Sequence, residues 1–399
     1  MKKLISNLLR IRIWDISHIF KFIIAWPIAR IYRHRRRHIW LICEYKDEAR
    51  DNAYWFFKYL TTEQKHIDAV YAINKKADDY KKVCDLGEIV QYGSFKHWIY
   101  YIAAEVNISS QKGGKPNAAV CYVLEVSGIW KNKRVFLQHG IILSELPYLF
   151  CKNARLSLIT CGAAPEYINV KKYYGYSENS VCYTGMCRFD RLHHVQRDQH
   201  LILIVPTWRE YVTKSYKKRT TFSETDYFKK WNSLLNEKRL DNILSEYEMK
   251  VLFCPHRNMS QFRTQFNSES TRIRILDWQE VDISNIIEKA SLLITDYSSI
   301  SMDFAYMKRP VLYYQFDKER FRNEHLSKSY FDFEDDGFGP VCTDLDVLLN
   351  ELCNVLEDGC IMNEYYVGRH NRFFPLYDDK NCMRTYFCIK EQVSKISKG

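Results

Sequence analysis

The stretch LITDYSSISMDF, residues 293–304, joins two different sequence patterns. Residues 292–294 are apolar and predict a short buried strand. From Met302 to Met307 apolar residues recur at helical spacing and predict the buried side of a helix. The five mainly polar residues between them, 295–299, include an aspartate and two adjacent serines. The stretch therefore predicts a strand that turns into a helix through a polar junction.

This polar junction has two interpretations. The first N–H groups of a helix lack partners inside the helix and carry the positive end of its dipole. Ser, Thr and Asp side chains cap such ends, so one interpretation is an ordinary capped helix. The other is an anion site, because free N–H groups and hydroxyls at the carboxyl end of a strand suit a phosphate. The spacing alone favours the cap, and the rest of the chain has to decide.

The composition predicts a folded, basic protein of two domains. The 399 residues exceed one ordinary core, and 46% are hydrophobic and 15% aromatic, which excludes a disordered chain. Lys and Arg number 59 against 48 Asp and Glu, so the net charge is +11. Such a charge suits nucleic acid, an anionic membrane or a phosphate-rich substrate. No RNA-binding signature occurs and the cations concentrate near the N-terminus, so we expect no nucleic-acid partner.

The thirteen cysteines show neither CxxC pairs nor the spacing of a zinc site. Cys182 and Cys187 are the closest pair, and no nearby residues complete a set of four ligands. Without a secretory signal, this usage predicts reduced and mostly buried thiols and no metal site. No carboxylate pair has a clear divalent-metal spacing either, so the sequence leaves metal dependence open.

Residues 1–38 form a basic amphipathic segment in which apolar and cationic residues alternate. The longest uncharged run near its middle, 22–29, is too short to span a bilayer. With its aromatic residues and the arginine run at 33–38, the segment predicts an interfacial helix on an anionic membrane surface. That helix would place the protein peripherally on the cytoplasmic face of the cell membrane. The alternative is a helix packed on the protein with solvated arginines, and the sequence leaves both open.

Strand and helix patterns alternate through most of the chain, which predicts an α/β fold of parallel sheets with helices on both faces. The predicted strands of the first half are 38–44, 66–74, 88–94, 106–110, 134–140 and 156–162. Those of the second half are 201–209, 247–256, 271–277, 291–296 and 309–317. Helical patterns occur at 47–60, 95–105, 225–237 and 282–290, and again in the last stretch, about 343–397.

The alternation breaks at 191–200, which is charged and has no apolar period. This break predicts a linker between an N-terminal Rossmann-like domain, 39–190, and a C-terminal one, 201–399, which includes the closing helices. We expect the two domains to face a cleft.

Three predicted strand ends carry residue types that are common in catalysis. One in the first half ends with His139 and Gly140, and one in the second half ends with His256 and Arg257. The third is the polar junction at 295–299. A single histidine at a strand end is often only a hydrogen-bonded loop residue. Two of them at corresponding edges indicate a site, because His moves protons near neutral pH.

Several segments also match one family pattern, and they do so in order. They are DNAYWFFKYL (51–60), QYGSFKHWIYYIAAEVNISS (91–110), LQHGI (137–141), YTGMCRFDRL (183–192), VPTWRE (205–210), FCPHRN (253–258), LLITDYSSISMDFAYMKRPVLYY (292–314) and YFDFEDDGFGPV (330–341). On these motifs the chain resembles the CDP-glycerol glycerophosphotransferase family, the teichoic-acid and capsule polymerases and primases. The resemblance covers the chain from about residue 39 to 345.

The resemblance implies a GT-B type enzyme and gives roles to the strand-end residues. His139 is the implied general base, and His256 is implied to donate a hydrogen bond to phosphate. Ser298 and Ser299 are implied to hold the donor diphosphate, with Asp303 at the ribose or in the phosphate network. The other implied site residues are Thr295, Arg209 and Arg257 for donor binding, and Gly140, Arg188 and Asp190 for the cleft.

The implied reaction moves glycerol phosphate or ribitol phosphate from a CDP-glycerol or CDP-ribitol donor to a hydroxyl of a lipid-linked saccharide or a polyol-phosphate chain, and releases CMP. Gln138, Cys187 and Arg257 stand where the family usually has Trp, Pro and Pro, and they leave the donor and acceptor open. The alternative is a GT-B glycosyltransferase that uses a nucleotide sugar in capsule or surface polysaccharide synthesis. No pattern indicates the oligomeric state.

Overall fold

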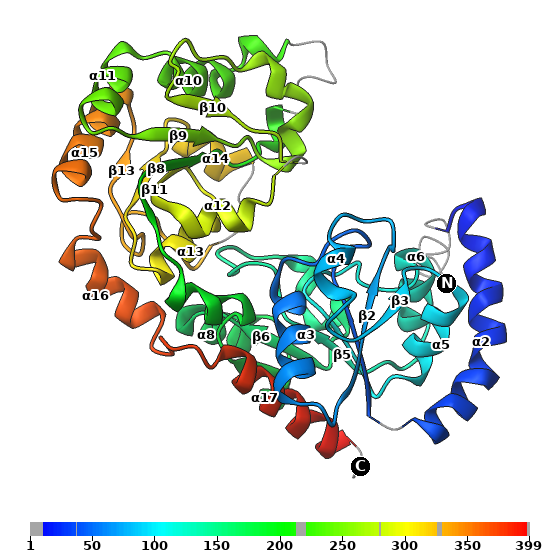
Figure 1. Cartoon of the computed structure of the whole chain (residues 1–399). Helices are drawn as coiled ribbons and strands as arrows, with labels where there is room; N and C mark the ends of the chain where they lie inside the picture. Colours follow the sequence, from blue (N-terminus) through cyan, green and yellow to red (C-terminus); the bar gives the residue numbers. More distant parts are fainter. Residues whose placement is uncertain (1–10, 37, 213–220, 279–280, 325–328, 397–399) are drawn as a thin grey trace. The chain divides into compact units, whose positions relative to one another are not determined.

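Two all-parallel β-sheets organise the chain, as the alternating patterns predict (Figure 1). The computed structural model of the protein describes residues 11–36, 38–212, 221–278, 281–324 and 329–396. The chain divides into two units, each built around one sheet. The first unit contains residues up to Ile141, Pro147–Asp190 and the residues from Asp378 onward, and the second contains Ile142–Leu146 and Arg191–Tyr377.

The sheet of the first unit has seven strands in the order β3-β2-β1-β4-β5-β6-β7. The strands are β1 (Ile39–Cys43), β2 (Asp68–Ile73), β3 (Glu88–Gln91), β4 (Val106–Ser109), β5 (Arg134–Phe136), β6 (Leu158–Cys161) and β7 (Val181–Tyr183). All six strands predicted for the first half are confirmed, and β7 is additional. The chain order reverses between β1 and β4, so the loops after these two strands border the position where open parallel sheets bind ligands.

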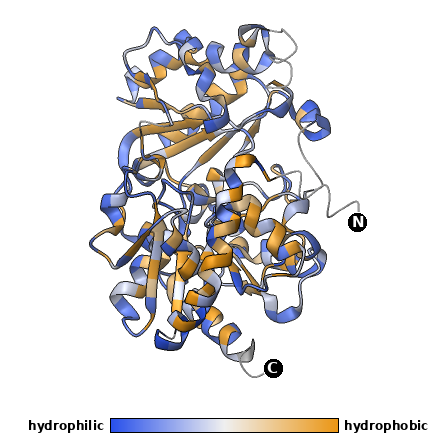
Figure 2. Cartoon of the chain, turned by 90° about the vertical axis from the view of Figure 1, so that its right-hand side faces the viewer, coloured by the Kyte–Doolittle hydropathy of each residue, from blue (hydrophilic) through white to orange (hydrophobic). Residues whose placement is uncertain are grey.

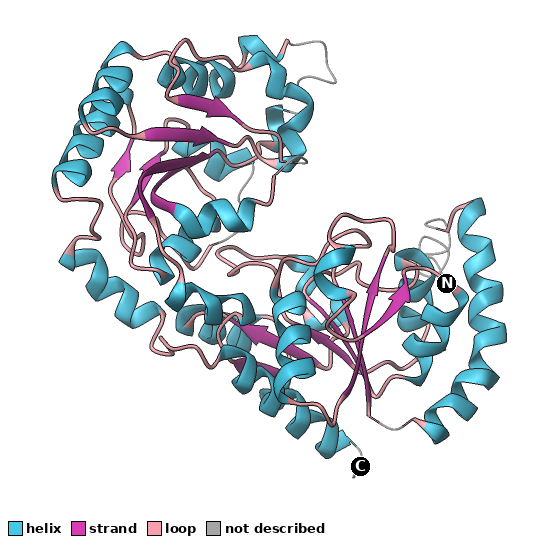
Figure 3. Cartoon of the chain, viewed as in Figure 1, coloured by secondary structure: helices cyan, strands magenta, loops and turns pink. Residues whose placement is uncertain are grey.

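Helices cover both faces of this sheet (Figure 3). They are α2 (Ile16–Arg35), α3 (Asn52–Glu63), α4 (Tyr80–Val83), α5 (Phe95–Ala103), α6 (Ala118–Val126), α7 (Cys151–Ala154), α8 (Ala164–Tyr173) and α17 (Asn381–Ile396), with short 3-10 helices η1 (Ile13–Asp15), η2 (Pro147–Leu149) and η3 (Glu178–Ser180). Alternate residues of β1 point to opposite faces. Ile39 and Leu41 pack with α2 and α5, whereas Trp40 and Ile42 pack with α3 and α17.

Helix α2 is a packed element with a second, exposed apolar face. Phe22, Ala25 and Ala29 are buried against α5, and the Phe22 ring meets that of Trp98 at 5.7 Å. Arg36, which follows the helix, forms ion pairs with Asp68 and Glu88. The other face exposes large apolar side chains, namely those of Ile16, Phe20, Ile23, Ile24, Ile28 and Ile31. Packing on the protein and an apolar outer face are therefore both present in one helix. Residues 1–10 and Arg37 of the predicted segment 1–38 lie outside the described residues.

The C-terminal helix α17 belongs to the first unit, which corrects the predicted domain boundary of 201–399. Cys382, Tyr386 and Ile389 are buried in the same core as α3. Asp190 accepts hydrogen bonds from the N–H groups of Asn381 and Cys382, at 2.7 and 2.9 Å, and so caps the first turn of α17. These contacts join residues that lie almost 200 positions apart, and for that reason the sequence pattern did not reveal them.

The sheet of the second unit has six strands in the order β10-β9-β8-β11-β12-β13. The strands are β8 (Asp198–Val205), β9 (Lys250–Phe253), β10 (Ile273–Ile275), β11 (Ala290–Thr295), β12 (Val311–Tyr314) and β13 (Val341–Cys342). All five strands predicted for the second half are confirmed, and β13 is additional. Figure 2 shows hydrophobic residues along these strands. Here the chain order reverses between β8 and β11.

The helices of the second unit cover both faces of its sheet. They are α10 (Asp226–Leu235), α11 (Lys238–Glu246), α12 (Ile283–Lys289), α13 (Ile300–Tyr306), α14 (Lys318–Glu324), α15 (Leu345–Glu357) and α16 (Glu364–Phe373), with the 3-10 helices η5 (Phe222–Glu224) and η6 (Arg257–Gln265). The predicted linker at 191–200 is wrong in detail. The 3-10 helix η4 (Cys187–His194) enters the second unit, and β8 already begins at Asp198.

The cysteines follow the prediction with one exception. Cys182 and Cys388 form a disulfide between β7 and α17, although the sequence predicted reduced thiols. The other eleven are free, and most of them are buried, as predicted. The two bonded residues are 206 positions apart, so their pairing has no signature in local spacing.

Among the described residues, no helix combines the length and the apolar character that a bilayer crossing requires.

Two phenylalanines of α2 provide a test of its packing. Phe22→Ala should lower the free energy of unfolding by about 3–5 kcal/mol, because it removes a buried ring from a packed cluster. Phe20→Ala changes the same residue type on the same helix, where the ring is 61% exposed instead of 4%. Its effect should stay within about 0.5 kcal/mol. Urea unfolding of both variants measures the difference, and equal losses would show that α2 does not pack as described.

Candidate functional site

His139 lies in the loop that follows β5, at the carboxyl edge of the first sheet. The preceding residue, Gln138, is buried and has a φ of 60°, which few non-glycine residues adopt. Its side-chain amide donates hydrogen bonds to the Thr160 carbonyl at 2.6 Å and to Glu166 at 3.1 Å. Because a buried amide fixes this unusual backbone turn, His139 is presented at the sheet edge by a rigid loop.

The environment of His139 favours a neutral ring. Partial desolvation and the positive charge of Arg188 lower its pKa below the ordinary value of 6.5, and outweigh a hydrogen bond to the backbone of Ser110 that raises it. The residue is nevertheless exposed, so desolvation is incomplete and the ring can exchange protons. A hydrogen bond to a backbone carbonyl uses one ring nitrogen as donor, and the other nitrogen of the neutral ring is then an acceptor. In this neutral state the His139 ring can act as a base.

Asn52 and Arg188 hold this loop from two sides. The Asn52 amide donates to the Gln138 carbonyl at 2.9 Å, and its oxygen accepts the N–H of Arg188 at 3.0 Å. The Arg188 guanidinium donates to the His139 carbonyl at 3.1 Å and to Asp51 at 3.2 Å. The structure thus brings His139, Gly140 and Arg188 together. It places Asp190, the third predicted cleft residue, as the cap of α17.

His256 follows β9 in the second unit, and its tautomer is defined by one hydrogen bond. The N–H of Asn258 donates to His256 Nδ1 at 3.1 Å, so in the neutral ring the proton lies on Nε2. The ring is half-buried, with the Trp278 ring at 6.1 Å. The N–H of the neutral His256 ring is therefore at Nε2. The side chain of Arg257, which is next in the chain, is exposed.

The junction at 295–299 behaves partly as a cap. Ser298 Oγ accepts the N–H of Ile300 at 3.3 Å, while the exposed Ser299 makes no capping bond with its side chain. The helix α13 begins at Ile300, and Asp303 is buried in its first turn. The Thr295 hydroxyl donates to the Val205 carbonyl at 2.6 Å inside the sheet. Thr295 is therefore occupied in joining strands, and the two serines are the accessible part of the junction.

Arg209 is fully buried and forms an ion-pair network. Its guanidinium donates to Asp296 at 2.8 Å, to Asp317 at 2.8 Å and to the Thr207 carbonyl at 2.9 Å. Burial by itself would raise the pKa of Asp317, but the Arg209 charge and hydrogen bonds from Arg209 and two tyrosines lower it below its ordinary value. The network fixes the loops after β8, β11 and β12. Arg209, predicted to bind the donor, is placed as a positioning residue without exposed surface.

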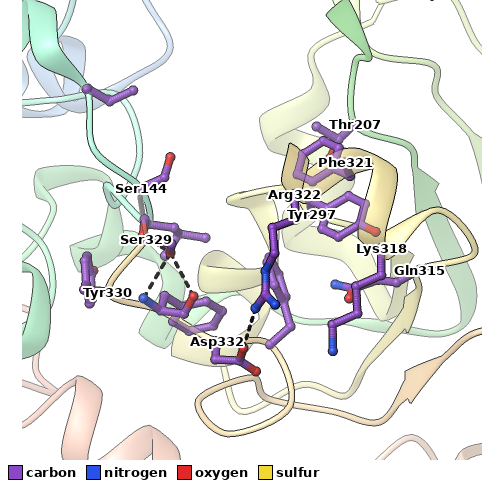
Figure 4. A pocket seen from close by; sticks show the side chains of 14 residues that line it. Ser144, Thr207, Tyr297, Gln315, Lys318, Phe321, Arg322, Ser329, Tyr330 and Asp332 are labelled. Atoms are coloured by element: carbon purple, nitrogen blue, oxygen red, sulfur yellow. Dashed lines mark hydrogen bonds and ion pairs between the residues drawn. The ribbon is translucent and has the colours of Figure 1, made fainter. Parts of the chain in front are cut away.

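A cavity of about 560 Å³ opens beside this network, and all its lining residues belong to the second unit (Figure 4). We call it the second-unit cavity. Its walls are parts of 143–146, the loops after β8, β11 and β12, helix α14 and residues 329–333. Ser144 and Ser329 form an antiparallel bridge that joins two of these segments. The cavity thus lies at the carboxyl edge of the sheet, where α/β proteins bind ligands.

Several residues of these sites were not predicted from the sequence. Gln138 and Asn52 had no signal as site residues beyond the motifs that contain them. The cavity residue Gln315 lies near the end of the predicted strand 309–317, and Lys318 and Arg322 follow that strand. Polar residues at the end of a buried strand and after it are the signal that could have identified them. Residues 329–333 have no periodic pattern. Within the described residues, no group of three or more His, Cys, Asp or Glu side chains is arranged to hold a metal ion.

Two parallel sheets with polar loops at their carboxyl edges define a GT-B type α/β protein. The structure of the wall teichoic acid polymerase TagF has this fold, with a TM-score of 0.65 and 15% identity over 99% of each chain. MnaA from S. aureus, solved with UDP, shares it with a TM-score of 0.53 and 14% identity, over 89% of this chain and 96% of its own.

Sequence comparison gives the family. Residues 24–391 match the CDP-glycerol:poly(glycerophosphate) glycerophosphotransferase family, and the chain belongs to it. It is 28% identical to the minor teichoic acid biosynthesis protein GgaB of Bacillus subtilis, over 91% of this chain and 41% of GgaB. It is 31% identical to the teichoic acid poly(glycerol phosphate) polymerase of Bacillus spizizenii, over 52% of this chain and 50% of the polymerase. The chain spans half or less of the length of these relatives.

Replacement of Arg209 tests the buried network. Arg209→Met should destabilise the protein by about 3–5 kcal/mol, because it leaves two carboxylates buried without their cation. This loss of stability should become smaller as the pH falls below 3.8, the ordinary pKa of an aspartate. Below that pH the parent itself loses the stabilisation that the lowered pKa of Asp317 provides. Arg320→Met, at a half-exposed position of α14, is the matched control. Unfolding in urea at two pH values measures both, and a loss no larger than that of the control would contradict the network's role.

Proposed function

We propose that the chain transfers glycerol phosphate or ribitol phosphate from a CDP-polyol donor to a hydroxyl of a lipid-linked saccharide or a polyol-phosphate chain, in the synthesis of teichoic acid or a capsule-type polymer. Family membership supports the reaction class. The observation that carries the proposal is the complementary state of two histidines. The lowered pKa of His139 favours a neutral ring that can accept a proton, and His256 carries its N–H on Nε2.

In the proposed reaction, the acceptor oxygen attacks the β-phosphorus of the donor. His139 takes the proton of the attacking hydroxyl, the new O–P bond forms, and the bond between the β-phosphorus and the bridging oxygen breaks. CMP leaves with that oxygen. His256 donates to the phosphate, and Ser298 and Ser299 bind the diphosphate with their hydroxyls. Phosphoryl transfer depends mainly on positioning and charge stabilisation, which such a set of groups supplies.

The other predicted residues have supporting roles in this proposal. Arg188 holds the His139 loop, and Arg209 holds the loops that carry Thr207 and Ser298. Arg257 is exposed and follows His256 in the chain, and we propose that it contacts a phosphate of the donor. Asp303, in the first turn of α13, stays a predicted contact to the ribose or the phosphate network.

A donor screen tests the reaction. The protein is incubated with CDP-glycerol, CDP-ribitol and UDP-sugars, with a short glycerol phosphate oligomer as acceptor, and the released nucleotide and product mass are measured. The proposal expects CMP and an added polyol-phosphate unit. Release of UDP with an added sugar would instead establish the glycosyltransferase alternative, whose fold is the same.

His139→Ala should lower turnover by about two to four orders of magnitude, the usual share of general acid–base catalysis. CDP-glycerol affinity should change little, because a base acts on the acceptor. In the parent, kcat/KM should fall only below pH 6.5, because a base with a lowered pKa stays neutral to lower pH. His66→Ala, a histidine that bonds Tyr386 far along the chain, is the control. Turnover of folded His139→Ala close to that of the parent would remove His139 from the mechanism.

We also propose that the exposed face of α2 associates with an anionic membrane on its cytoplasmic side, where a lipid-linked acceptor would be available. The support is the combination of an apolar face with the exposed cations Arg30, Arg33 and Arg35 on the same helix. Apolar side chains enter the interface of such a membrane, and each cation near its surface adds roughly 1 kcal/mol. Because α2 also packs on α5, its deletion would disturb the fold, and surface substitutions are the better test.

The triple change Phe20→Ser, Ile24→Ser and Ile31→Ser should abolish sedimentation with anionic vesicles and leave the melting temperature unchanged, since all three side chains are exposed. A matched control changes one phenylalanine and two isoleucines that are equally exposed elsewhere, Phe387, Ile168 and Ile361. The control should bind vesicles as the parent does, and salt should weaken that binding. Equal vesicle binding by both triple variants would place the membrane contact outside α2.

A further inference from the structure

The reaction steps above name His139, His256 and the serines, and they assign no ligand to the second-unit cavity. We propose that this cavity binds one polyol-phosphate unit. The inference rests on the proposed function, because it names the substrate part that the second unit would hold. The unit could come from the donor, as the group to be transferred, or from the end of the acceptor, and the experiment below separates these sources.

The floor of the cavity is rigid and its aromatic rings are already engaged. The rings of Tyr297 and Phe321 stack on each other with centroids 3.7 Å apart and an angle of 5°. The Arg209 guanidinium lies 4.8 and 4.6 Å from the two centroids. Rings that stack on each other and on a cation offer less free surface for stacking with a nucleobase. This favours a ligand that binds through its polar groups.

The walls supply both cations and groups that bind hydroxyls. Lys318 and Arg322 lie four residues apart on α14, so they are on one face, with Cβ atoms about 5–6 Å apart. Figure 4 shows Arg322 directed to Asp332 and Lys318 beside Gln315. Cations bind a phosphate, whereas a carboxylate and an amide accept or donate hydrogen bonds with hydroxyl groups. A polyol phosphate carries both kinds of group on one small molecule.

The carboxylates near these cations do not prevent anion binding. Arg322 pairs with Asp332 at 3.6 Å, and Lys318 pairs with Glu334 at 2.5 Å. The Arg322 side chain is 69% exposed, and the ion pair with Asp332 at 3.6 Å uses one of the five N–H donors of its guanidinium. Exposed ion pairs are weak, so a phosphate oxygen can join them. Both cations line the cavity.

The uncharged residue Thr207 provides a second indication of a ligand. Its hydroxyl oxygen is buried in the cavity wall and has no hydrogen-bond partner within the described part of the chain. A buried polar atom without a partner is costly, and such atoms are often satisfied by a ligand. Its backbone is fixed by Asp296 and Arg209, so the hydroxyl is held in place. A polyol hydroxyl would complete this position.

The chain sequence also connects the cavity to the proposed base. Leu143, in the cavity wall, is four residues after His139. Ser329 donates to the Leu143 carbonyl at 2.6 Å, which fixes this wall within the second unit.

The experiment compares Lys318→Gln, Arg322→Gln and their combination with Arg320→Gln. Arg320 lies on the same helix with the same charge, but it covers the Tyr211 ring and does not line the cavity. Thr207→Val removes only the buried hydroxyl and keeps the charges. Calorimetry with CMP, CDP-glycerol and a short oligo(glycerol phosphate) gives the affinities, and steady-state assays give KM for donor and acceptor. Melting curves check that each variant is folded.

The double variant should lose at least tenfold in affinity for a ligand that contains glycerol phosphate, and Thr207→Val should lose severalfold. Arg320→Gln should bind every ligand as the parent does, and the affinity for CMP should be the same in all variants. A loss for CDP-glycerol that CMP does not share assigns the unit to the donor. A higher KM and weaker binding for the oligomer, with CDP-glycerol unchanged, assigns it to the acceptor. Equal losses for CMP and CDP-glycerol, or no loss for any ligand, overturn the inference.

The parent protein separates this inference from the proposed function. If the parent releases no CMP from CDP-glycerol, the proposed reaction fails, whatever the cavity binds. If the parent turns over but the cavity variants equal the Arg320 control, only the cavity inference fails.

Discussion

The second unit depends on one buried cation. Arg209 lies beyond β8, and its two carboxylate partners follow β11 and β12, so a single side chain joins three neighbouring loops at the sheet edge. Asp296 extends the connection, because it also accepts the N–H groups of Thr207 and Tyr297, at 2.8 and 2.6 Å. A buried ion pair contributes little net stability but tolerates few other arrangements of its loops. It thereby fixes the junction at 295–299 and the floor of the second-unit cavity together.

The first unit also fixes the loops of its site, but it does so mainly with neutral amides instead of a buried ion pair. There, the neutral amide of Asn52 joins the loops after β5 and β7 to the start of α3, and the amide of Gln138 joins the loop after β5 to β6 and α8. The charged Arg188 lies at the margin. This difference suits the two histidines. Desolvation and, after it, the cation at the margin lower the pKa of His139 and so favour its neutral ring, while the buried cation of the second unit is neutralised by its carboxylates. In each unit, residues that are not proposed to touch a ligand position the loops of the residues that are proposed to bind one.

The sequence predicts what depends on local pattern. Buried strands are continuous apolar runs, so all eleven predicted strands exist, and the polar residues after them lie at one edge because parallel strands share direction. Long-range partners leave no such trace. The motif VPTWRE does not show which carboxylates bind Arg209, because these lie 87 and 108 residues away in the sequence. Asp190 looked like a cleft residue for the same reason, since the helix that it caps begins 191 positions later.

Helix α2 shows a further limit of pattern reading. Apolar residues surround it, so periodicity gives no single buried face, and the sequence supports both a packed helix and an interfacial one. The size and shape of the side chains decide which face of α2 packs on the protein. Ala25 and Ala29 allow close approach to α5, and Phe22 fills the space beside Trp98, which leaves the bulky isoleucines outside. A soluble helix normally has polar residues at such outer positions. Here the fold leaves exposed apolar side chains and exposed arginines on the same helix.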